Sequence, residues 1–265
     1  MPMGKTMMKH LGLLLPLAMA LPAFAGDPAF DKAYRCMRAT VPSTLRVQDI
    51  QFDSTDRAGG TRMLRGKVYA TVEKGLARVS IRITAPANVA GAAYLVRERG
   101  AGQEDDMFVY LPSVGRVRHV TGAFANGSLL GTDFSYAETK LIQNAFSGAD
   151  GKLEAPETLD GRALQVFSLL PKSPKTSAYS RVRVHMDDKT CVPLKADFYQ
   201  GETLRKQLAA PVTALKPSGK YWFLSEIDMR DLVEGSHTTI RIGAAAEATG
   251  ISKGLFDPNS FYQGN

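Results

Sequence analysis

The feature that most constrains this chain is a period of two in the hydrophobicity of residues 62–84. Between residues 64 and 72 the even-numbered positions are mainly apolar and the odd-numbered ones polar, and the pattern resumes after Lys74-Gly75. The apolar members of the shared face are Leu64, Val68, Ala70, Val72, Ala77, Val79, Ile81 and Ile83. Two alternating runs around a short glycine turn predict a β-hairpin with one dry face.

Nine further segments resemble strands, and most are linked by short turns. They are residues 94–99, 106–111, 116–120, 163–170, 181–187, 192–199, 202–208, 221–229 and 238–243. With the hairpin this makes about eleven strands. Because parallel neighbours need connections of a dozen or more residues, short turns indicate an antiparallel meander. The apolar fraction of 44% agrees with one folded domain over residues 26–265.

Two short helices interrupt the strands. Asp27-Pro28 supplies an N-cap and a helix-starting proline, and Pro42 ends the apolar stripe that follows. Ser135 and Glu138 have the spacing of a capping box, inside a segment, residues 122–159, that lacks strand periodicity. One large sheet with two short apolar helices predicts a mainly β fold: an unclosed antiparallel barrel whose open mouth is covered by helices.

The N-terminus has the pattern of a secretory signal peptide. Lys5 and Lys9 precede an apolar run over residues 11–21, and an Ala-Phe-Ala site ends at Ala25. The run is too short to span a bilayer. We therefore expect cleavage after Ala25 and a periplasmic chain beginning at Gly26.

Two cysteines, Cys36 and Cys191, remain after that cleavage. An even pair in an oxidising compartment predicts a disulfide, which would join the N-terminal helix to a strand in mid-chain. Two buried free thiols are the alternative.

Catalytic and metal-binding motifs are not evident. His119, His185 and His237 lie on separate predicted strands without ligand spacing, and the nucleophile-elbow and phosphate-loop patterns are missing. Acids at Asp105-Asp106, Asp133 and Glu138 leave a glycosidase pair as an alternative. Basic residues are dispersed, which disfavours nucleic acid as a partner. The sequence predicts a protein that is not an enzyme and has no catalytic residues, metal or cofactor.

Several ordered motifs resemble the outer-membrane lipoprotein-sorting protein-like family, relatives of the carrier LolA. The main ones are DMFVYLPSVGRVR at residues 106–118 and LGTDFSY at 130–136. Shorter matches follow in the family's order at residues 179–182, 193–199, 229–231, 237–239 and 255–257. The resemblance covers residues 62–262.

The resemblance implies an unclosed β-barrel that holds lipid or lipoprotein acyl chains in a hydrophobic cavity. Some relatives are associated with exporters of the resistance-nodulation-division type, which makes an inner-membrane exporter a candidate partner. A sensor or interaction module that binds a membrane-protein partner is the alternative on this fold. The residues we expect to line the cavity and its mouth are Leu64, Val68, Val72, Val79, Ile81, Ile83, Val109, Leu111, Phe134 and Tyr136.

Overall fold

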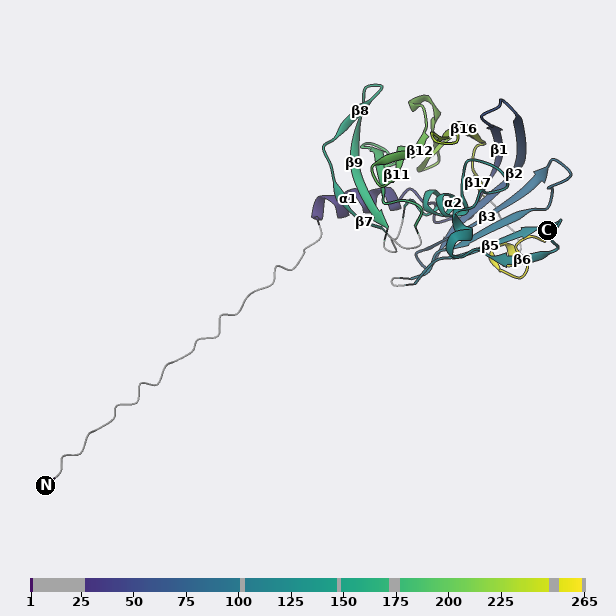
Figure 1. Cartoon of the computed structure of the whole chain (residues 1–265), viewed down its shortest axis with the longest axis horizontal. Coiled ribbons are helices and arrows are strands. Elements are labelled where there is room, and N and C mark those ends of the chain that lie inside the picture. The colour runs from purple at the N-terminus through teal and green to yellow at the C-terminus, as the bar shows by residue number, and fades with distance from the viewer. Residues whose placement is uncertain (2–26, 101–102, 147–148, 172–176, 248–252, 264–265) are drawn as a thin grey trace.

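The structure is a computed structural model that describes residue 1 and residues 27–100, 103–146, 149–171, 177–247 and 253–263. The expected signal peptide lies outside the described residues. The fold is mainly β, with one large antiparallel sheet and few helices, and Figure 1 shows the sheet as two curved halves side by side.

The first half of the sheet is a simple meander in which each strand pairs with the next. Its strands are β1 (Arg46–Thr55), β2 (Thr61–Glu73), β3 (Leu76–Ala85), β4 (Ala93–Arg97), β5 (Asp106–Leu111) and β6 (Arg116–His119). β6 is one edge of the sheet.

The chain then crosses to the opposite edge and meanders back. The strands of this half are β7 (Ala149–Leu153), β8 (Glu157–Leu159), β9 (Arg162–Pro171), β10 (Arg181–Asp187), β11 (Pro193–Gln200), β12 (Thr203–Ala209), β15 (Glu226–Asp231), β16 (Ser236–Ile242) and β17 (Ala246–Glu247). β16 pairs with β1, which joins the halves, whereas β6 and β7 end the strand order of the described sheet. The sheet is therefore not closed into a barrel.

The connection between the two edges crosses the inside of this curve. It contains the short helix η1 (Gly122–Asn126), a loop, and α2 (Tyr136–Gln143), and we call residues 120–146 the plug. Figure 1 places α2 between the two halves. Ser135 caps α2 by accepting from the amide of Glu138, whose side chain accepts from the amide of Ser135, so the predicted capping box is confirmed.

The predicted hairpin of residues 62–84 is confirmed in register. Val72 faces Ala77, and the two turn residues Lys74 and Gly75 both have positive φ, as a tight hairpin turn requires. A register shift follows at Gly66, where a Cβ would lie only 2.3 Å from the backbone oxygen of Arg82. Only glycine therefore fits at this bulge.

The strand count differs from the prediction of about eleven, since the described residues form seventeen strands. β1, β7, β8, β17 and the strand at residues 215–218 were missed, and β7 and β8 lie in the segment, residues 122–159, that was expected to lack strands. The predicted strand 221–229 is two strands separated at Ser225. Its first part, β14 (Tyr221–Leu224), pairs with β13 (Leu215–Ser218) in a separate two-stranded sheet that follows the short helix η2 (Val212–Ala214). Its second part begins β15.

Two hydrophobic cores line the inner face of the sheet, one in each half. The first contains buried residues of β1–β5 and the second those of β9–β12 and β15; Ile240 and Ile242 of β16 pack against both. A third cluster lies elsewhere: Phe261, near the helix η3 (Lys253–Phe256), packs with Ala93 and Leu95 of β4.

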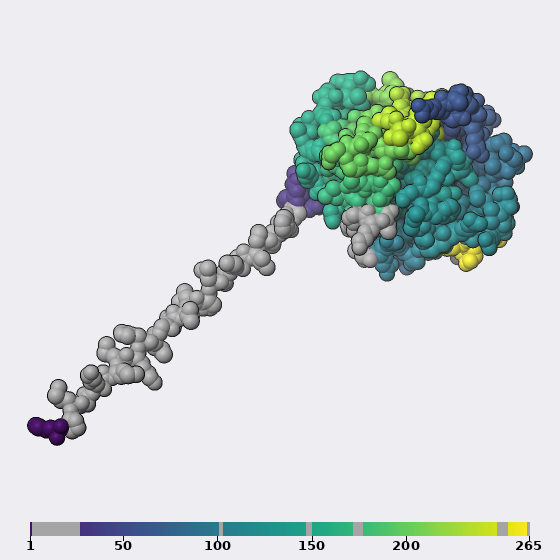
Figure 2. Space-filling model, in the orientation of Figure 1, coloured from purple at the N-terminus to yellow at the C-terminus, as the bar shows by residue number. Residues whose placement is uncertain are grey.

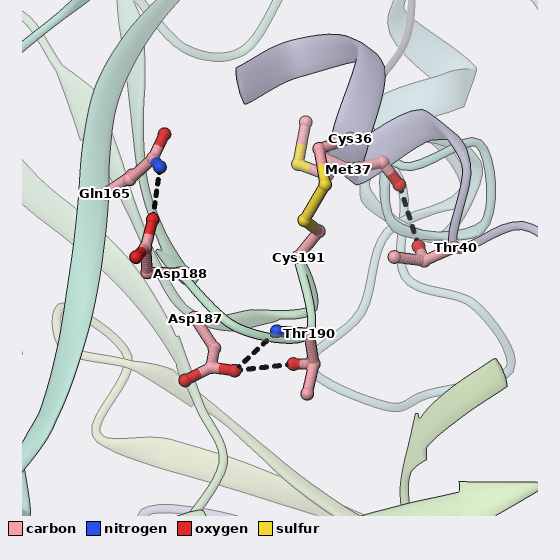
Figure 3. The surroundings of a disulfide bond; sticks show 8 residues. All are labelled: Cys36, Met37, Thr40, Gln165, Asp187, Asp188, Thr190 and Cys191. Carbon is pink, nitrogen blue, oxygen red and sulfur yellow. Dashed lines mark hydrogen bonds between the residues drawn. A yellow bond between two sulfur atoms is a disulfide. The ribbon is translucent and has the colours of Figure 1, made fainter. Parts of the chain in front are cut away.

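Helix α1 (Pro28–Arg38) covers part of the second core. Phe30, Ala33 and Met37 are buried on one face of the helix. The ring centroids of Phe30 and Phe167 are 5.9 Å apart. The predicted Cys36–Cys191 disulfide is present, and it ties α1 to the turn between β10 and β11 rather than to a strand (Figure 3). In that turn Asp187 accepts bonds from the amide and hydroxyl of Thr190.

Candidate functional site

The inner face of the first half gathers most of the residues expected to line a cavity. Seven of them are buried in its core: Leu64, Val68, Val79, Ile81, Ile83, Val109 and Tyr136. Leu111 packs against that core, and Phe134 is buried in the second core. Val72, near the turn of the hairpin, is only half-buried.

The plug fills the space above this face. A void of about 10 Å³ remains where Leu64, Ile81 and Ile83 meet Leu129 and Leu130 of the plug. Such a void has room for about one water molecule. The described conformation is therefore a closed one, and an acyl chain could reach these residues only if the plug moved. Figure 2 shows teal atoms of the middle of the chain between the blue and green halves.

Two plug aromatics enter different cores. Phe134 is 2% exposed within the second core and Tyr136 is 4% exposed within the first. The Tyr136 ring lies 5.3 Å from that of Tyr94, whose hydroxyl donates to the Tyr136 carbonyl at 2.8 Å. Burial raises the pKa of both tyrosines, so both hydroxyls remain protonated at neutral pH.

The plug is fastened to β16 through Asp133. Its carboxylate accepts hydrogen bonds from the hydroxyls of Ser236 and Thr238, the latter at 2.7 Å. The Asp133 amide in turn donates to the Thr238 oxygen at 2.9 Å. These contacts join a loop to the rim of the sheet by polar bonds alone.

Glu138 makes a second polar attachment one turn further along. Its side chain is fully buried, and its Oε1 lies 3.1 Å from Nζ of Lys206 on β12. The hydroxyl of Tyr179 donates to the same carboxylate, and Lys206 also donates to the carbonyl of Asp133 at 2.6 Å. Burial, together with the adjacent Glu138 carboxylate, raises the pKa of Tyr179, which keeps it a hydrogen-bond donor.

The C-terminal end of the plug is held by α1 and by the residue just before β5. Arg38 forms a two-pronged ion pair with Glu98 at 2.8 and 2.9 Å and donates to the carbonyl of Asn144. Lys140 of α2 lies 3.4 Å from Asp105. Polar contacts thus fasten the middle of the plug and its C-terminal end, while the apolar side chains between these attachments are buried in the two cores.

The three histidines do not come together: His237 is exposed on β16, between Ser236 and Thr238. His119 is exposed and stacks on Phe108 at 4.8 Å. His185 is buried, with Nε2 3.3 Å from Asp197. No group of three or more metal-binding side chains occurs within the described ranges.

The acids considered as a catalytic pair have other contacts. Asp106 pairs with Arg99 at 2.6 Å, whereas Asp133 and Glu138 serve the plug attachments.

An open groove of about 460 Å³ lies between β1, β2, β3 and β16. Its charged residues include Asp49, Arg65 and Arg241, which bond to Lys67, Gln51 and Asp53 respectively. Apolar side chains make up a smaller share of its lining than of the inner face beneath the plug.

Sequence reasoning missed the sheet's half of the attachment site, namely Tyr179, Lys206, Ser236 and Thr238. One signal was available in the sequence. Lys206 alternates with Leu204 and the buried Leu208 on β12, so it lies on the same face of the strand as these apolar residues. It also missed Leu129 and Leu130, whose place opposite Ile81 depends on the path of the plug.

None of the helices within the described ranges is both long and apolar enough to cross a membrane.

Comparisons with known proteins agree on the fold. A family model described as "-like: Uncharacterized protein" matches residues 75–263. The search of curated proteins found no match. The structure resembles that of a DUF1329 family protein from Desulfovibrio piger, with a TM-score of 0.76, 25% identity, and coverage of 86% of this chain and 96% of that one.

Two further solved structures share the fold. One is described as an outer membrane lipoprotein-sorting protein domain from Vibrio parahaemolyticus (TM-score 0.78, 20% identity, 88% and 97% coverage). The other is a LolA superfamily protein from Nitrosomonas europaea (TM-score 0.66, 17% identity, 85% and 96% coverage). The chain therefore has a LolA-like fold, as the sequence motifs predicted.

Proposed function

We propose that this chain, which belongs to the family whose model matches residues 75–263, is a periplasmic carrier of lipid or lipoprotein acyl chains. The acyl chain would replace the plug on the inner face of the sheet. The residues proposed to contact it are the eight expected ones that belong to the sheet, with Leu64, Ile81 and Ile83 at the centre, whereas Phe134 and Tyr136 belong to the plug and would move with it. The mechanism requires no catalysis.

The observation that carries this proposal is the way in which the inner face is covered. The plug belongs to neither meander, and its rim attachments are hydrogen bonds and ion pairs. A segment held in this way can leave while every strand pairing stays intact. The sheet would then present a continuous apolar surface.

The free energy gained by burying an acyl chain is comparable with that gained by burying the apolar side chains of the plug. Burying an acyl chain contributes about 0.8 kcal/mol per CH₂, so a chain of ~16 carbons gains on the order of 10 kcal/mol. The plug buries several large apolar side chains, including Leu129, Phe134 and Tyr136, each worth about 1.5–3 kcal/mol. Since one apolar occupant replaces another, uptake and release can both proceed without an external energy source.

The similar solved structures support the choice of cargo. One is described as an outer membrane lipoprotein-sorting domain and another as a LolA superfamily protein. Passage of cargo from an inner-membrane exporter is part of the proposal and rests on the family resemblance. Export itself predicts that the protein recovered from the periplasm begins at Gly26.

Native mass spectrometry of protein purified from the periplasm tests the proposal, followed by lipid extraction. We expect a fraction of the molecules to carry the added mass of a lipid or acylated protein. A co-purifying peptide without lipid would favour the interaction-module alternative. A protein that carries no lipid and takes up no fluorescent acyl probe would contradict the carrier function.

A further inference from the structure

We propose that the cargo is an anionic amphiphile, and that Lys206 and Tyr179 bind its negatively charged headgroup. The expected ligand has an acyl chain that ends in a carboxylate or phosphate. This inference rests on the proposed function, because it requires the plug to leave the inner face.

The first argument is the direction of the hydrogen bonds. The sheet supplies the side-chain donors that meet the two plug carboxylates: Lys206 and Tyr179 donate to Glu138, and Ser236 and Thr238 donate to Asp133. The plug supplies the carboxylates. In the closed conformation the rim of the sheet thus already holds two anions, both from its own chain.

The second argument is what remains when the plug departs. Lys206 belongs to β12 and Tyr179 lies two residues before β10, so both stay with the sheet while Glu138 leaves. The Lys206 side chain is only 13% exposed and borders the second core through Leu208. That exposure applies to the closed conformation. When an acyl chain takes the place of the plug it covers Lys206 again, and a covered cation without a partner is costly, so the cargo-bound state favours a ligand that brings an anion.

A neighbouring acid does not replace Glu138. Asp231 faces Lys206 across the β12–β15 pair, but its carboxylate already accepts from Arg205 at 2.9 Å and from the amides of Val233 and Glu234. When Glu138 leaves, Lys206 therefore loses its carboxylate partner and no neighbouring acid takes its place.

The headgroup preference is tested with probes of equal chain length. Hexadecanoate and hexadecyl phosphate are compared with the neutral methyl hexadecanoate and hexadecanol, by displacement of a fluorescent acyl probe. Because Lys206→Met alone would leave Glu138 buried without its partner, the comparison uses Glu138→Gln as background. The variants are Glu138→Gln, Glu138→Gln/Lys206→Met, and Glu138→Gln/Lys67→Met, where Lys67 pairs with Asp49 on another part of the surface.

In the Glu138→Gln background we expect the anionic probes to bind about tenfold or more tightly than the neutral ones. Adding Lys206→Met should abolish this preference and leave binding of methyl hexadecanoate within about twofold, whereas Lys67→Met should preserve it. A difference between hexadecanoate and hexadecyl phosphate would identify the headgroup. Equal binding of charged and neutral probes would overturn the headgroup inference and leave the carrier function standing. If none of the probes binds, the carrier function itself fails.

Discussion

Phe134 and Tyr136, separated by one residue, are buried in two different hydrophobic cores. Each belongs to the same plug, so this short segment connects the two halves of the sheet on their inner side. Closure of the plug and stability of the whole sheet are therefore coupled.

Tyr136→Ala is expected to weaken that coupling. Removing a ring packed against Tyr94 should lower the free energy of unfolding by about 3 kcal/mol and increase uptake of a fluorescent acyl probe. Urea denaturation and probe titration measure the two effects. Asn126→Ala, on the same plug but exposed, is the control and should cost less than about 1 kcal/mol. Unchanged uptake by Tyr136→Ala would argue against the plug as the gate.

Ile81→Trp tests the inner face as the acyl site. The larger ring should occupy space that an acyl chain needs, so uptake of the probe should fall severalfold with nearly unchanged circular dichroism. Overpacking should cost about 1–3 kcal/mol of stability. Lys67→Trp is the matched control, since Lys67 lies on the neighbouring strand but is exposed and paired with Asp49. Equal uptake by both variants would refute the assignment of Ile81.

Loss of the disulfide should mainly destabilise the fold. Cys36 and Cys191 are 155 residues apart, and cross-linking so long a loop stabilises by at most about 5 kcal/mol on the chain-entropy model. The double variant Cys36→Ser/Cys191→Ser should therefore unfold at clearly lower guanidinium concentration. Adding a reductant should shift the midpoint of the parent in the same direction and leave the double variant unaffected. A parent insensitive to reductant would contradict the bond.

The lowered pKa of Asp197 predicts that the fold loses stability in acid. Burial alone would raise its pKa, but hydrogen bonds from His185, Gln207 and Lys195 lower the pKa to about 2. Because the folded pKa lies below the usual 3.8, the stabilisation is complete above that value and disappears as pH falls toward 2. The contribution is about 2 kcal/mol.

Urea denaturation between pH 5 and pH 2 measures this contribution. Asp197→Asn should be less stable at pH 5 and show a flatter decline, so that its difference from the parent narrows in acid. Glu202→Gln, on the exposed turn between β11 and β12, should retain the decline of the parent. A constant difference between Asp197→Asn and the parent would refute the prediction.

Gly66→Ala should damage the β2–β3 bulge. Its Cβ would lie 2.3 Å from a backbone oxygen, so the two strands must separate, at a cost of about 2 kcal/mol or more. Gly100→Ala, where a Cβ would meet no atom within 4 Å, is the control and should change stability by less than about 0.5 kcal/mol. Equal stability of the two variants would show that β2 and β3 do not approach so closely.

The sequence predicted best those strands whose inward positions are all apolar. The hairpin of β2 and β3 is such a case, because burial of one face fixes both period and register. β1 was missed because its inward positions begin and end with polar residues, and only Ile50 and Phe52 in the middle are apolar inward residues.

The attachment site of the plug could not be predicted in the same way. Glu138 was identified from its capping box, which is a local pattern. Its partners Tyr179 and Lys206 come from 41 and 68 residues further along the chain, and only the return of the second meander brings them to α2. Local periodicity contains no information on such a meeting.

Because the plug is the covalent link between β6 and β7, it can swing aside but cannot diffuse away. Bound cargo thus competes with a tethered plug, whose effective concentration stays constant irrespective of how much free lipid is present. When the cargo dissociates, the plug covers the inner face again, so this apolar surface does not stay exposed to water. The cargo-free protein would in this way avoid self-association through its apolar inner face.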